Sequence, residues 1–69
     1  MKLSARNRLT GTVTSINRGE AIANVAIEVG GQRIVSSITV EAVDELGLKE
    51  GSSATAIIKA SDVMIATDI

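Results

Sequence analysis

The sequence of 69 residues contains no cysteine, no histidine and no aromatic residue. Disulfides and structural metal sites built on cysteine or histidine are therefore excluded, and no large aromatic side chain packs in the core. A chain this short buries only about 60% of the surface that it exposes when unfolded, so we expect its stability to be small. With these other supports absent, the sequence predicts that oligomerisation supplies extra burial.

The same absences argue against an enzyme, because histidine, cysteine and tyrosine provide the usual proton shuttles and nucleophiles. Lys59 and Ser61 could in principle form a base and a nucleophile, but the sequence KAS is short and common. The carboxylates of VDELGLKEG lie at a predicted helix and turn, where a solvated surface is expected, and no spacing indicates a cation site. The sequence predicts a protein without catalytic residues.

The sequence also has no large excess of charge of either sign. Seven Lys and Arg residues and eight Asp and Glu residues give a formal net charge of −1. No overall basic field can hold nucleic acid through counterion release, so any anion site must be local. The first residues lack the apolar core of a signal peptide, and no apolar run approaches the ~20 residues that span a membrane. We expect a cytoplasmic protein with neither nucleic acid nor membrane as partner.

Apolar and polar residues alternate along three successive segments, which is the pattern of half-buried strands. These strands are expected at residues 9–16, 21–29 and 32–39. Gly30 and Gly31 predict a hairpin turn between the second and third strands, because glycine enters positive φ freely. An apolar period of three then indicates one short helix at residues 40–46, with Thr39 as its N-cap and Gly47 at its end.

Two more strands are expected at residues 54–60 and 63–69. The order predicts an all-β fold, a small five-stranded OB-like barrel with one short helix between strands three and four. The last two strands are apolar on both faces, whereas a small barrel has only one interior. The second apolar face is therefore expected in a subunit interface. No linker or repeat divides residues 1–69, which are expected to form a single domain.

Three segments are rich in hydrogen-bond donors. SARNR offers a hydroxyl, guanidinium groups and an amide, SSIT offers three hydroxyls, and KAS offers an ammonium group, a hydroxyl and backbone N–H groups. A fully deprotonated tetrahedral oxyanion only accepts hydrogen bonds, so its site requires donors and no inward carboxylate. Composition alone still favours an ordinary polar strand edge for each segment.

The stretches MKLSARNRLTGTVTSI, VSSITVEAVDELGL and AIIKASDVMI together resemble the molbindins, small cytoplasmic proteins that bind molybdate and tungstate. The likeness spans essentially the whole chain, and the pair of SARN and IKAS is its most distinctive part. It implies a Mop domain of the OB type that assembles as a homohexamer, a trimer of dimers, with oxyanions held between subunits. A protein for the binding and storage of molybdate or tungstate, without a cofactor, is therefore expected.

The resemblance also implies, by motif, an oxyanion-binding set of Ser4, Arg6, Thr39, Lys59, Ala60 and Ser61. Ala60 is expected to act through its backbone N–H, because its side chain has no polar group. The family has a second kind of site near the threefold axis, whose residues no motif places in this chain. Arg8 departs from the Gln or Lys often found after SARN, but no member of the set depends on it.

Two other functions remain open on the sequence. An OB-like order is typical of modules that bind single-stranded nucleic acid, but such modules use stacking aromatics and a basic groove, which this chain lacks. The fold can also serve as an oxyanion-sensing interaction module of a transporter or transcription factor. Met1 directly before the motif, and an end after the fifth strand, favour a free-standing protein.

Overall fold

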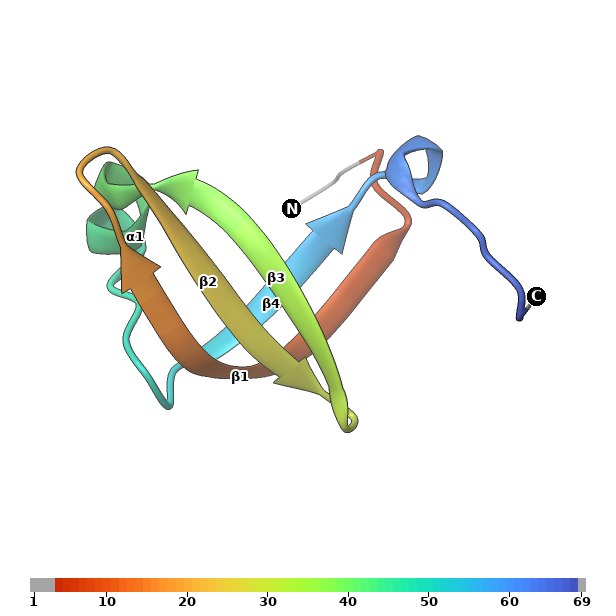
Figure 1. The fold of residues 1–69 in the computed structure, drawn as a ribbon, viewed down its shortest axis with the longest axis horizontal. Coiled ribbons are helices and arrows are strands. Elements are labelled where there is room, and N and C mark those ends of the chain that lie inside the picture. The colour runs from red at the N-terminus through yellow and green to blue at the C-terminus, as the bar shows by residue number, and fades with distance from the viewer. Residues whose placement is uncertain (1–3, 69) are drawn as a thin grey trace.

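The computed structural model describes residues 4–68, which form a curled four-stranded antiparallel sheet and one short α-helix (Figure 1). The strands are β1 (Asn7–Arg18), β2 (Ile22–Val29), β3 (Gln32–Thr39) and β4 (Ser53–Ile58). The helix α1 (Val40–Leu46) connects β3 to β4, and the 3₁₀ turn η1 (Ala60–Asp62) follows β4. The strand order is β3-β2-β1-β4, so β3 and β4 are the edge strands.

The sheet curls at β1, because the two halves of β1 pair with different strands. Residues 7–12 pair with β4 and residues 12–18 pair with β2, both in the antiparallel sense. The pairing register shifts between Val13 and Ser15, near the place where β1 bends from one partner to the other (Figure 1). An irregularity of this kind bends a strand and increases its twist. The described residues thus confirm an all-β fold with one helix between the third and fourth strands.

Gly11 lies where the backbone of β1 closely approaches that of β2. A Cβ added to Gly11 would overlap the carbonyl oxygen of Glu28 and would lie 2.8 Å from Cγ2 of Val29. A bulkier residue would therefore have to push the backbone of β2 away from β1. The absence of a side chain at this position is a condition for the sharp curl.

The core lies inside the curl, between the sheet and α1. Its buried cluster comes from β1, β2 and α1 and consists of Val13, Ala23, Val25, Ile27 and Val43. The alternation of the second strand predicted the three members that β2 provides. Ala26 is buried as well, although it lies outside this cluster and alternation places it on the other face of β2.

The hairpin turn and the helix form as predicted. Gly30 and Gly31 have φ angles of 55° and 82°, so both occupy the left-handed region that glycine favours. The helix α1 begins after Thr39, whose hydroxyl oxygen accepts a hydrogen bond from the N–H of Ala42 at 3.0 Å. It ends at Gly47, with φ of 64°. No helix within residues 4–68 has the length and apolar character needed to cross a membrane.

The end of the chain differs from the expectation. β4 ends at Ile58, because residues 60–62 form the turn η1 instead of continuing the strand. Residues 63–68, expected as a fifth strand, belong to no strand of the described chain, and Ile69 lies outside the described residues. A strand needs a neighbouring edge for its backbone hydrogen bonds, and this segment runs away from the sheet after η1 (Figure 1).

Candidate anion-binding site

Two of the three donor-rich segments meet at one end of the β1–β4 pair. Residues 4–6 directly precede β1, and residues 59–61 directly follow β4. Asn7 and Ile58 are the first register pair of these antiparallel strands, so the residues beyond them leave the sheet at the same end (Figure 1). Pairing across 51 positions of sequence therefore brings together the two segments that hold five of the six predicted residues.

Side chains reinforce the backbone pairing at this end. Asn7 donates a hydrogen bond from Nδ2 to the carbonyl oxygen of Ile58 at 3.1 Å, in a half-buried position. The hydroxyls of Thr10 and Thr55 form a second bond across the same strands at 3.0 Å. The two segments thus extend from a strand pair whose relative position is fixed by side-chain as well as backbone bonds.

The donors of these segments are accessible. The five predicted residues of the two segments are solvent-exposed: Ser4, Arg6, Lys59, Ala60 and Ser61. Of these, Ala60 is expected to donate from its backbone N–H. Among residues 4–68 the one ion pair joins Arg18 to Asp44 at 3.0 Å, so neither cation of the two segments is neutralised by a described carboxylate. A guanidinium group, an ammonium group and two hydroxyls are available to an acceptor.

The turn η1 also leaves backbone donors unused. The N–H groups of Asp62 and Val63 donate to the carbonyl oxygens of Lys59 and Ala60, at 2.8 Å and 3.2 Å. The N–H groups at the start of such a turn have no acceptor within it, and Ala60 holds that position. The backbone N–H of Ala60 is therefore not used by the turn, as its predicted role requires.

Within a single chain, Thr39 is separated in space from the other five predicted residues. It ends β3, where it pairs with Ile22, and it lies beside α1 at the other end of the sheet from η1 (Figure 1). Its hydroxyl oxygen caps α1 by accepting a bond from Ala42. A hydroxyl has one donor and two acceptor positions, so this bond leaves the O–H of Thr39 able to donate to an anion.

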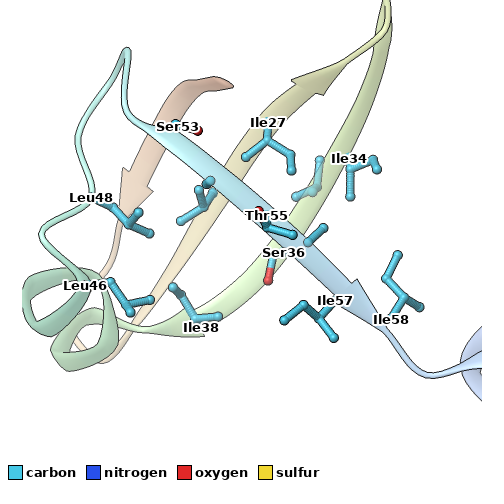
Figure 2. Close-up of a pocket in the computed structure, with 14 residues that line it drawn as sticks. Ile27, Ile34, Ser36, Ile38, Leu46, Leu48, Ser53, Thr55, Ile57 and Ile58 are labelled. Carbon is cyan, nitrogen blue, oxygen red and sulfur yellow. The ribbon is translucent and has the colours of Figure 1, made fainter. Parts of the chain in front are cut away.

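A pocket of about 480 Å³ lies apart from these donors, between the edge strands β3 and β4 (Figure 2). None of the six predicted residues lines it. Its wall is mainly aliphatic and includes Ile27, Ile34, Ile38, Leu46, Leu48 and Ile57. Aliphatic groups cannot compensate an oxyanion for its lost hydration, so this pocket is an apolar surface rather than an anion site.

Asn7 was missing from the predicted set. It stands inside SARN, directly after Arg6, and this position in the motif is the one signal that sequence offers. Its acceptor is a backbone carbonyl 51 positions away, and that contact is visible only after the strands are paired.

Comparison with known proteins places the whole described fold among anion-binding proteins. The family model of the TOBE domain matches residues 3–65. Molybdenum-pterin-binding protein 1 of Clostridium pasteurianum is 48% identical over 66 residues, which cover 94% of this chain and 97% of that protein. The structure of a molybdate-binding protein from Sporomusa ovata has a TM-score of 0.93 at 34% identity, covering 97% of this chain and 100% of that one. The cytoplasmic molybdate-binding protein ModG, with molybdate bound, has a TM-score of 0.90 at 55% identity, covering 93% of this chain and 46% of ModG.

Proposed function

The chain belongs to the TOBE domain family, as a molbindin of the Mop type, and from this membership we propose that it binds and stores molybdate in the cytoplasm without catalysing a reaction. Residues 1–69 act as one binding domain. The observation that carries the proposal is the meeting of the segments of Arg6 and Lys59 at the end of the β1–β4 pair. Relatives described as molybdate-binding proteins support the choice of ligand.

The donors of this site suit a tetrahedral dianion. Molybdate presents four acceptor oxygens, and Arg6 and Lys59 offset its charge while Ser4, Ser61 and the N–H of Ala60 donate to the remaining lone pairs. The two cations give a local positive potential in a chain whose net charge is −1. Tungstate has nearly the same size and charge, so the same donors bind it.

The site is completed between subunits. Thr39 lies at the far end of its own sheet, so the O–H that it can donate reaches an anion only at the site of a second copy. This arrangement supports a site in which residues from more than one copy surround each oxyanion. The resemblance to the molbindins implies that the copies form a homohexamer, a trimer of dimers.

The fifth strand of the barrel also forms in the assembly. Val63, Met64 and Ile65 are 44%, 93% and 86% exposed in the single chain, a contiguous apolar surface that water disfavours. The pocket between β3 and β4 has an aliphatic wall and two free strand edges (Figure 2). Residues 63–68 of a second copy can pair with such an edge and bury their apolar side chains, which closes a five-stranded barrel.

Assembly has a direct test. Native mass spectrometry at micromolar concentration is expected to show a hexamer with bound molybdate. Met64→Asp is expected to dissociate it, because a charge cannot be buried without a partner. Gln32→Glu adds the same charge to the exposed hairpin and is expected to leave the hexamer intact. A well-folded wild-type monomer under these conditions would contradict the assembly.

Selectivity tests the donor-only character of the site. At neutral pH essentially every phosphate ion carries at least one P–OH group, which is a donor that needs an acceptor, whereas molybdate needs none. We expect phosphate at a concentration comparable with that of molybdate to leave the calorimetric titration of molybdate unchanged. Tungstate, as the matched control, is expected to displace it. Displacement by phosphate would show that an acceptor such as the carboxylate of Asp62 faces the anion.

A further inference from the structure

We propose that Asn7 is a positioning residue for the anion site. Its carboxamide holds the segment of residues 4–6 and the segment of residues 59–61 in one fixed relative position. This role rests on the proposed function for its ligand, but the contact on which it depends joins two residues of the chain and involves no atom of the ligand. The Nδ2 of Asn7 donates to the carbonyl oxygen of Ile58 at 3.1 Å.

The position of this bond allows it to restrain both segments. Asn7 and Ile58 are the first residues of the β1–β4 register, and within residues 4–68 no backbone pair of these strands lies beyond them. The carbonyl of Ile58 and the N–H of Lys59 belong to the same planar peptide unit, as do the carbonyl of Arg6 and the N–H of Asn7. A bond between Asn7 and the Ile58 carbonyl therefore fixes the two peptide planes from which the anion-binding segments start.

The chemistry of this contact selects asparagine. A carbonyl oxygen only accepts hydrogen bonds, so the group that faces it must carry a hydrogen, and the NH₂ of a carboxamide does. An aspartate would place a carboxylate oxygen against the carbonyl oxygen and would bring a negative charge to the end where the anion binds. A lysine or arginine would donate, but its long side chain loses more rotamer freedom when it is held in place.

The positioning role predicts a loss of affinity without a loss of fold. Asn7→Leu keeps the approximate size of the side chain and removes its donor. We expect the dissociation constant for molybdate, measured by calorimetry on the assembled protein, to rise roughly threefold to tenfold. Thr10→Val is the matched control, because it removes the same kind of cross-strand bond, between the hydroxyls of Thr10 and Thr55, from the same two strands. It is expected to change affinity less than about twofold.

A second measurement does not depend on the anion. Backbone ¹⁵N order parameters report motion on the picosecond to nanosecond timescale. In the ligand-free Asn7→Leu variant they are expected to fall at residues 4–6 and 59–61 and to stay unchanged in β2 and β3. A residue that merely stabilised the fold would not confine the change to these two segments. If Asn7→Leu does not fold, Asn7→Ser is the second variant. Serine keeps a small polar group but is too short to replace the carboxamide donor, and the same results are expected.

The outcomes separate this role from the proposed function. Unchanged affinity in Asn7→Leu, or an equal loss in Thr10→Val, overturns the positioning role while molybdate binding by the wild type stands. If the wild type does not bind molybdate, the proposed function fails and the order parameters decide the role of Asn7. Order parameters unchanged in both segments would overturn it.

Discussion

Gly11→Ala is expected to lower the free energy of unfolding by about 3 kcal/mol, one of the largest effects that a single methyl group can have in this chain. The added Cβ would overlap the carbonyl oxygen of Glu28 and crowd Val29. Backbone is the obstacle, so no change of rotamer relieves the overlap. Urea unfolding followed by circular dichroism, at matched protein concentrations, measures the loss.

Thr12→Ala is the control for Gly11→Ala. Thr12 follows Gly11 in β1 and its side chain is exposed, so its truncation is expected to cost less than about 1 kcal/mol. Equal losses in the two variants would show that β1 yields to a new side chain and that the tight approach to β2 does not limit the curl. A displaced β1 would also move Asn7, because Asn7 and Gly11 both belong to the segment of β1 that pairs with β4.

Lys59→Ala and Arg6→Ala are each expected to weaken molybdate binding by roughly tenfold to a hundredfold. Each substitution removes a charge-assisted hydrogen bond to a dianion, the strongest kind of contact that the site offers. Both side chains are exposed and lie outside the strands, so the fold and the assembly are expected to persist. Calorimetric titration of the two variants measures the change.

Lys49→Ala is the matched control for these two variants. Lys49 is also an exposed cation, but it lies before β4, at the opposite end of that strand from Lys59. Its removal lowers the net charge equally and is expected to leave affinity within about twofold. Unchanged affinity in both Lys59→Ala and Arg6→Ala would mean that the motif assigns the site to the wrong residues.

The elements that depend on local pattern were predictable from the sequence. Alternation in β2, glycine at the hairpin turn, and the capping of α1 by Thr39 are properties of neighbouring residues, and the structure confirms each of them. The predicted fifth strand does not form in residues 63–68, because a strand needs a neighbouring edge for its backbone hydrogen bonds and these residues pair with no strand of the described sheet. The apolar run of residues 63–66 indicates a capacity for burial and carries no information about the location of the partner.

The candidate site was predictable in part, and for a different reason. The resemblance to the molbindins selected residues that lie some fifty positions apart, and the register of β1 and β4 explains why the segments around Arg6 and Lys59 meet. The distance of Thr39 from them, and the bond made by Asn7, are consequences of sheet topology. No local pattern of residue types encodes either feature.

The pairing of β1 with β4 sets the order in which the chain acquires its site. We expect the β2–β3 hairpin to form before the β1–β4 pair, because the hairpin joins neighbouring residues, whereas Asn7 and Ile58 lie 51 positions apart and closing the longer loop costs more entropy. The two segments proposed to bind the anion meet only after this closure. A ligand that binds them is therefore expected to leave the folding rate unchanged and to slow unfolding.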